Sequence, residues 1–280
     1  MRAPKFNLTR ANGMDLAHYD WAAGSGAPVV FCHATGFHGR CWDQVIRNMS
    51  PEVTAVALDM RGHGRSQQVP PPMHWRDFGE DVAALGEKLE WSGVLGVGHS
   101  MGGYAVTLAA ALRPGTFRGL VLLDPVIMAP ESYSGPWVPE HFARKRRRQW
   151  DSPDEMFERF QSRAPFNLWD EQVLRDYCDY ALNERGELAC PPEVEGSIYE
   201  NCTMPESDIS AALERIDIPV VVVRSVIEFV VGFTAMEASP TDPRLAQILP
   251  HGRDEHWRDV SHFIPMEQPE RVAQLISAQD

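Results

Sequence analysis

The residues Gly98-His99-Ser100-Met101-Gly102 form a G-x-S-x-G pentapeptide between a short apolar run and a helix-like stretch. In that position the glycines permit a sharp turn from strand to helix, which exposes the serine hydroxyl at the end of a sheet. Such a serine is a candidate nucleophile for acyl transfer, or else only a capping residue of the turn. Because the pentapeptide also arises by chance, its chemistry depends on partners elsewhere in the chain.

The serine needs a base, because its hydroxyl is a weak nucleophile until its proton is accepted, and an imidazole does this near neutral pH. His262 follows a candidate strand over 255–260 and precedes a helix that starts near Gln268. We therefore expect His262 to lie on a loop at a strand end and to act as the base. Three other histidines lie in Gly-rich turns, where packing and backbone hydrogen bonds are their expected role: His33, His63 and His99.

The histidine in turn needs a carboxylate that fixes its tautomer and stabilises the imidazolium as it forms. Asp124 ends an apolar run over 120–123, directly before Pro125, whereas Glu228 follows an apolar run over 219–223. We favour Asp124, because it marks a clear exit from strand to loop and the residues around Glu228 lack the Gly and Asp common in acid-bearing turns. Glu228 stays the alternative acid, and a capping carboxylate is the alternative role for Asp124.

Acyl transfer also needs hydrogen-bond donors directed at the oxyanion that develops on the substrate. The backbone amide of Met101, the residue after the serine, lies at a helix start where the helix dipole adds to its effect. A second amide should come from the loop His33-Ala34-Thr35-Gly36-Phe37, which follows the apolar run over 28–32. We expect Thr35 to supply it, so Thr35 and Met101 form the predicted oxyanion hole.

The elements that would position these residues alternate along the chain. Residues 6–10 and 15–21 form a predicted hairpin around an Asn12-Gly13 turn. Five short apolar runs are typical of parallel strands buried on both faces: 28–32, 53–58, 94–97, 120–123 and 219–223. Helix-like stretches lie over 40–49, 75–89, 101–112, 244–249 and 270–277. This alternation predicts an α/β fold with a parallel sheet and right-handed crossovers.

Residues 128–205 interrupt the alternation, since they contain helix-like pieces over 154–163 and 171–182 but no comparable strand. We interpret them as a mostly helical cap over the carboxyl ends of the strands, where open α/β sheets bind ligands. The predicted domains are therefore a core of residues 1–127 and 206–280 and a cap of residues 128–205. Aromatic side chains of the cap either pack it onto the core or contact an apolar substrate: Tyr133, Trp137, Phe142, Trp150, Phe157, Phe160, Phe166 and Trp169.

Composition limits the partners of the chain. The formal net charge of -13 over 280 residues disfavours nucleic acid, whose affinity for proteins comes largely from Lys and Arg. We interpret the basic run Arg144-Lys145-Arg146-Arg147-Arg148 as a solvated helix face. No segment has the pattern of a secretory signal or is long and apolar enough to cross a bilayer, so we expect a soluble, cytoplasmic protein without a membrane partner.

The five cysteines lack CxxC spacing and favour neither a disulfide framework nor a zinc site: Cys32, Cys41, Cys178, Cys190 and Cys202. No other metal-ligand cluster and no dinucleotide fingerprint is found in the sequence. We therefore expect a reducing environment, no metal and no organic cofactor.

Four motifs, in this order, resemble those of the α/β-hydrolase family: residues 33–37 (HATGF), 59–66 (DMRGHGRS), 98–103 (GHSMGG) and 261–270 (SHFIPMEQPE). The resemblance covers nearly the whole chain outside residues 128–205. It implies an eight-stranded, mostly parallel sheet flanked by helices, a helical cap, a Ser-acid-His triad and two oxyanion amides. The chain departs from the usual pattern at Ala34 and Ser261, where the family commonly has glycine. Members that dehalogenate or open epoxides carry Asp as nucleophile, so Ser100 disfavours those two chemistries.

These features predict a serine hydrolase of the carboxylesterase kind, which acts through an acyl-enzyme on a small to medium, partly apolar ester. The same triad also opens lactones, cleaves carbon–carbon bonds or makes peracids, and these stay alternatives within enzymes. A different class is a signalling protein that binds a small ligand in a hydrolase pocket without fast turnover. The sequence does not determine the natural substrate or the oligomeric state.

Overall fold

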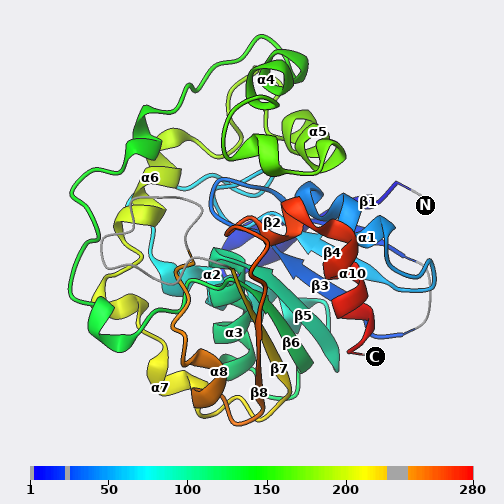
Figure 1. The fold of residues 1–280 in the computed structure, drawn as a ribbon, viewed down its shortest axis with the longest axis vertical. Helices are drawn as coiled ribbons and strands as arrows, with labels where there is room; N and C mark the ends of the chain where they lie inside the picture. Colours follow the sequence, from blue (N-terminus) through cyan, green and yellow to red (C-terminus); the bar gives the residue numbers. More distant parts are fainter. Residues whose placement is uncertain (1–2, 23–25, 226–238, 280) are drawn as a thin grey trace.

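The computed structural model describes residues 3–22, 26–225 and 239–279. These residues form one eight-stranded sheet in the order β1-β2-β4-β3-β5-β6-β7-β8, with helices on both faces (Figure 1). The pairs β1–β2 and β2–β4 are antiparallel, and all other neighbouring strands of this sheet are parallel. The predicted eight-stranded, mostly parallel α/β fold is confirmed.

The hairpin at the start of the chain forms as predicted. It joins β1 (Lys5–Ala11) to β2 (Met14–Trp21). The turn residues Asn12 and Gly13 have φ values of 48° and 70°, the left-handed conformation that a tight hairpin requires and that Asn and Gly tolerate best. Because β2 pairs with β4, the hairpin extends one edge of the sheet.

The parallel strands lie where the apolar runs predicted them, with one exception. They are β3 (Val29–Cys32), β4 (Ala55–Leu58), β5 (Val94–His99), β6 (Phe117–Leu123), β7 (Val220–Arg224) and β8 (Gly252–His256). The strand predicted over 255–260 was misplaced, since β8 ends at His256. β8 is the last strand of the sheet and is half-exposed, so its polar sequence lacks the apolar run that a buried strand needs.

Helices pack against both faces of the sheet. On one face lie α1 (Asp43–Arg47) and α10 (Pro269–Ser277), and on the other α2 (Trp75–Lys88) and α3 (Met101–Leu112). Shorter helices are α7 (Ser210–Leu213), α8 (Leu245–Ile248) and α9 (Ile264–Glu267). Single 3-10 turns cover Gly39–Trp42, Pro130–Ser132, Phe142–Lys145, Phe166–Leu168 and Pro205–Ser207. The helix predicted over 40–49 is thus a 3-10 turn followed by the short α1.

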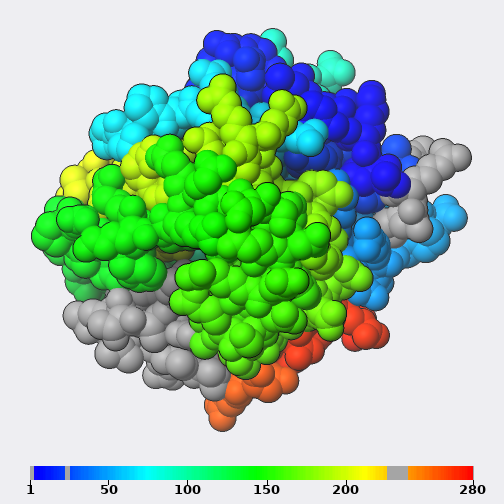
Figure 2. Space-filling view, turned by 90° about the horizontal axis from the view of Figure 1, so that it is seen from above, coloured from blue at the N-terminus to red at the C-terminus, as the bar shows by residue number. Residues whose placement is uncertain are grey.

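The segment over 128–205 carries α4 (Pro153–Phe160), α5 (Glu171–Tyr180) and α6 (Pro192–Glu200) and no named strand. It lies beyond one end of the sheet and, viewed from above, covers much of that face of the molecule (Figures 1 and 2). α4 and α5 were predicted, whereas α6 was not. The division into a core and an inserted cap at these boundaries stays a prediction.

Most of the aromatic side chains of this segment pack against one another and against the core. One buried cluster joins Trp150, Phe160 and Trp169 to Phe37 and Phe263 of the core. Phe142 is exposed, and Trp137 lines a pocket described below. Packing therefore accounts for most of the aromatic residues of the segment. Of the eight aromatic residues that the sequence singled out, Trp137 alone is among the described residues that line this pocket.

The basic run was interpreted as a solvated helix face, and this is wrong for the helix, since Arg146–Arg148 lie outside any helix, while Lys145, Arg147 and Arg148 are exposed. Its first part belongs to the 3-10 turn Phe142–Lys145, and each of its arginines pairs with a glutamate: Arg144 with Glu200, Arg146 with Glu195, Arg147 with Glu155 and Arg148 with Glu193. Three of these glutamates lie on α6. Ion pairing across the segment balances the charges of all four arginines, and Arg147 and Arg148 are exposed to solvent as well.

All five cysteines are buried and unpaired. None of the described helices is both long and apolar enough to span a membrane.

Candidate active site

Ser100 lies in the turn between β5 and α3, with φ of 56° and ψ of −117°. A positive φ is strained for a residue with a side chain, and such strain is typical of functional turns. The flanking glycines are needed for space. A Cβ on Gly98 would lie 2.4 Å from the Gly102 carbonyl oxygen, and one on Gly102 would lie 2.1 Å from that of Cys32. The spacing of the pentapeptide thus follows from close backbone packing.

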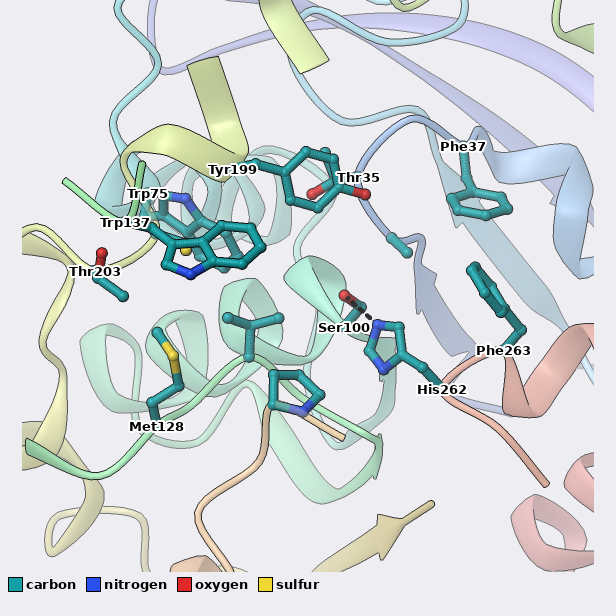
Figure 3. Close-up of a pocket in the computed structure, with 14 residues that line it drawn as sticks. Thr35, Phe37, Trp75, Ser100, Met128, Trp137, Tyr199, Thr203, His262 and Phe263 are labelled. Atoms are coloured by element: carbon teal, nitrogen blue, oxygen red, sulfur yellow. Dashed lines mark hydrogen bonds between the residues drawn. The ribbon is translucent and has the colours of Figure 1, made fainter. Parts of the chain in front are cut away.

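His262 reaches Ser100 from the loop between β8 and α9. Its Nε2 lies 3.0 Å from Ser100 Oγ, the contact drawn as a dashed line in Figure 3. His99 helps to hold this loop, because its Nε2 donates to the carbonyl oxygen of His262 at 2.8 Å. The two predicted residues, 162 positions apart in the sequence, are therefore brought within hydrogen-bond distance.

Asp124 lies behind His262, directly after β6, with its side chain completely buried. Its Oδ2 is 2.7 Å from His262 Nδ1. Ser225 donates to Asp124 through its backbone amide at 3.2 Å and its hydroxyl at 3.0 Å, and Ser239 Oγ donates at 2.5 Å. Burial alone would raise the pKa of Asp124, but the hydrogen bonds from His262, Ser239 and Ser225 outweigh it and lower the pKa below its ordinary value.

Of the two candidate acids, Asp124 is thus hydrogen-bonded to His262, whereas Glu228 lies outside the described residues. Ser100, His262 and Asp124 form a continuous row of hydrogen-bonded side chains drawn from the ends of β5, β6 and β8. Such a row can carry a proton from the serine to the imidazole and hold the imidazolium beside a negative charge.

The predicted oxyanion donors Thr35 and Met101 also lie together. Thr35 Oγ1 donates to Met101 Sδ at 3.4 Å, and Thr35 lines the same pocket as Ser100. Within the described part of the chain, the backbone amides of Thr35 and Met101 have no hydrogen-bond acceptor. Both amides are therefore free to bind an oxyanion, and their role stays a prediction.

The three histidines of the Gly-rich turns hydrogen-bond the backbone, as predicted. His33 Nε2 accepts from the Met60 amide at 2.9 Å, and His63 Nε2 accepts from the Gly36 amide at 3.0 Å. Burial lowers the pKa of His63 to about 4 and that of His99 to about 3. They stay neutral near pH 7 and support the loops around Ser100.

Ser100 and His262 open into a pocket of about 700 Å³, part of it open to solvent (Figure 3). Most of the lining side chains are apolar, and none of those described is Asp, Glu, Lys or Arg: Ala34, Thr35, Phe37, Trp75, Ser100, Val126, Met128, Trp137, Tyr199, Cys202, Thr203, Pro240, His262 and Phe263. Thr203 Oγ1 donates to the Gly135 carbonyl at 2.7 Å. The Tyr199 hydroxyl has no partner among the described residues.

Sequence reasoning missed several of these lining residues. Tyr199 belongs to α6, and Trp75 begins α2, and neither residue belongs to one of the four sequence motifs. No local signal distinguishes them: Tyr199 reaches the pocket through the packing of α6, and Trp75 lines it from α2, where its Nε1 donates to the carbonyl oxygen of Ile198 on α6. In the described ranges, no group of three or more His, Cys, Asp or Glu residues is arranged to hold a metal ion.

Comparisons with known proteins fit this geometry. The pattern of the Alpha/beta hydrolase family matches residues 29–275. The chain is 26% identical over 284 residues to a non-heme chloroperoxidase of Streptomyces lividans. This match covers 94% of this chain and 95% of that protein. It is 25% identical over 281 residues to the bifunctional esterase/perhydrolase DCH of Acinetobacter calcoaceticus, with 95% of both chains covered. The crystal structure of E-2-(acetamidomethylene)succinate hydrolase covers 98% of both chains at 19% identity, with a TM-score of 0.72.

The chain therefore belongs to the alpha/beta hydrolase family. Its relatives over nearly the whole length include an esterase/perhydrolase and a haloperoxidase, and the solved neighbour shares its fold. The family identified from the four sequence motifs is confirmed, and the protein is a hydrolase of this family.

Proposed function

We propose that this protein is a serine hydrolase that cleaves a carboxylic ester through an acyl-enzyme. Ser100 is the nucleophile, His262 the general base and acid, and Asp124 the carboxylate that orients His262. The observation that carries the proposal is the pair of contacts at His262, 3.0 Å to Ser100 Oγ on one side and 2.7 Å to Asp124 Oδ2 on the other.

In the proposed reaction, His262 Nε2 accepts the proton of Ser100 as its oxygen attacks the ester carbonyl. The amides of Thr35 and Met101 bind the oxyanion of the tetrahedral intermediate, and losing one such donor commonly costs about 10²–10³ in rate. The intermediate collapses, and His262 returns the proton to the departing alcohol. Water, deprotonated by His262, then attacks the acyl-enzyme, which releases the acid and restores Ser100.

The pocket favours an uncharged, partly apolar ester. No described side chain on its wall carries a charge that would neutralise a carboxylate of the substrate. The sequence over 226–238, outside the described residues, contains no Lys, Arg or His. Burying an unpaired charge is costly, so an anionic ester is disfavoured. The Tyr199 hydroxyl remains for a hydrogen bond to a polar atom of the substrate, and a small-molecule ester is the partner we propose.

A second candidate reaction is perhydrolysis, because one relative is named as an esterase/perhydrolase. Hydrogen peroxide would then replace water in the attack on the acyl-enzyme and give a peracid. The first half of the reaction, up to release of the alcohol, is the same.

The test is turnover of p-nitrophenyl butyrate by the wild type, by Ser100→Ala and by Ser50→Ala, a control at an exposed serine. We expect Ser100→Ala to lower kcat by about 10³-fold or more and Ser50→Ala to leave it unchanged. A wild type without turnover that binds small apolar ligands tightly would instead support the signalling class. Turnover that survives in Ser100→Ala would refute the assigned nucleophile.

A further inference from the structure

Arg146 is the least exposed arginine of the basic run. Its side chain is 23% exposed, against 48% for Arg148, two positions further on. Its Nη1 pairs with the carboxylate of Glu195 on α6, which is only 4% exposed. Its Nη2 donates to the hydroxyl of Tyr177 on α5 at 2.8 Å. One guanidinium therefore joins two helices of the segment over 128–205.

Both partners of Arg146 contact the loop that carries Thr35. The Glu195 carboxyl lies directly over Gly36, because a Cβ placed on Gly36 would be 2.9 Å from Glu195 Cδ. The Tyr177 ring packs on that of Phe37, with 5.5 Å between ring centroids.

Two further contacts hold the loop, one at His38 and one at the backbone amide of Gly36. His38 stacks on the Tyr177 ring, and its Nε2 donates to the Tyr177 carbonyl oxygen at 3.0 Å. From the opposite side, His63 Nε2 accepts from the Gly36 amide at 3.0 Å. Gly36 has a φ of 81°, so the loop turns sharply at the residue after Thr35. The position of the Thr35 amide is thus fixed between the core and the side chains joined by Arg146.

We propose that Arg146 and Glu195 are positioning residues for the oxyanion hole, which act through the loop of residues 34–38 on the Thr35 amide. This inference rests on the proposed function, since it assigns a purpose to the loop only if an oxyanion forms beside Ser100. An oxyanion donor is effective only when it points at the position that the oxygen occupies in the transition state. Loss of the ion pair between Arg146 and Glu195 therefore weakens binding of the transition state more than binding of the substrate.

The experiment compares Arg146→Met with Arg148→Met, a control that removes an exposed ion pair to the same helix, Glu193 on α6. For each variant, kcat and KM for p-nitrophenyl butyrate are measured, with the inhibition constant of an alkyl trifluoromethyl ketone. This ketone adds the serine oxygen and so forms an oxyanion. We expect Arg146→Met to lower kcat about tenfold, a part of the loss for a missing donor. Inhibition should weaken by a similar factor with KM nearly unchanged, while Arg148→Met has no effect.

Two milder variants keep the inference testable if Arg146→Met fails to fold. Glu195→Gln keeps the shape of the side chain over Gly36 but removes its charge, and Tyr177→Phe removes only the hydroxyl that accepts from Arg146. Both should lower kcat by a smaller factor than Arg146→Met, and Arg146→Lys should recover part of the loss because it can still pair with Glu195. Each folded variant is confirmed by its thermal unfolding midpoint.

The inference is overturned if the folded variants change kcat no more than Arg148→Met, or if they raise KM and leave kcat and ketone inhibition alone. The latter pattern would make the ion pair a part of the substrate pocket. A wild type that turns over no ester and is not inhibited by the ketone would contradict the proposed function itself, which separates the two failures.

Discussion

Replacing Asp124 by asparagine changes a single carboxylate oxygen into an amide nitrogen at the end of the hydrogen-bonded row. Asp124 accepts from His262 on one oxygen, and from Ser239 on the other, while Ser225 donates to both oxygens. An asparagine has one oxygen and one amide group, so it cannot accept from all of these donors. With its oxygen toward Ser239, its amide faces His262 Nδ1.

The magnitude follows from the tautomer that this arrangement imposes. An amide donor at Nδ1 places the imidazole proton on Nε2, which then points at Ser100 Oγ from 3.0 Å and cannot accept its proton. Substitutions of this kind in Ser-His-Asp triads lower kcat by about 10⁴, or about 5.5 kcal/mol of transition-state stabilisation. Because Asn has nearly the volume of Asp, we expect the fold to remain intact.

The assay is kcat for p-nitrophenyl butyrate at pH 7–8, measured for Asp124→Asn and for Glu228→Gln, with the thermal unfolding midpoint of each. We expect Asp124→Asn to lose about 10³–10⁴ in kcat and Glu228→Gln to lose little. If Asp124→Asn keeps more than about a tenth of the wild-type kcat while Glu228→Gln loses the larger factor, the assignment of the acid is wrong.

Three further predictions concern the turn that carries Ser100, the buried carboxyl of Asp176 and the charge of the substrate. Gly102→Ala places a Cβ 2.1 Å from the backbone oxygen of Cys32, so thermal melts should show a loss of about 3 kcal/mol or more, whereas Gly26→Ala, with open space around it, should show little change. Burial raises the pKa of Asp176 to about 6, so the folded state holds the proton more tightly and the free energy of unfolding rises as pH falls from about 7 toward 4. Asp176→Asn should remove this dependence in urea titrations and stabilise the protein at pH 8 by about 1–2 kcal/mol, after allowance for partial exposure; a stability unchanged at pH 8 would contradict it. Finally, kcat/KM for p-nitrophenyl butyrate should exceed that for the anionic p-nitrophenyl hemisuccinate by about tenfold or more, and equal values would contradict an uncharged pocket.

The sequence predicts the interior of this fold well because buried parallel strands must be apolar on both faces. The run over 219–223 identifies β7 for that reason, whereas the edge strand β8 has the polar sequence Gly252–His256 and was placed too late in the chain. An edge strand exposed to solvent carries no comparable pattern. α6 was missed for a related reason, since only Val194, Ile198 and Tyr199 among its nine residues are large and hydrophobic, and three others are glutamate.

The site was predictable where chemistry constrains local sequence, and not where packing alone decides. Ser100 lies in a turn that needs glycines on both sides, Asp124 directly follows β6, and His262 lies in the loop between β8 and α9. Arg146 and Tyr199 have no such constraint. The partners of Arg146 are distant in sequence, and a run of basic residues looks the same whether solvent or buried glutamates balance its charge.

The most direct test of the proposed mechanism is covalent labelling with an alkyl fluorophosphonate, followed by mass spectrometry of the digested protein. The mechanism predicts one label per chain, on Ser100, with the rate of labelling strongly reduced in Asp124→Asn and no label in Ser100→Ala. A label on another residue, or ester turnover that persists after Ser100 is fully modified, would contradict it.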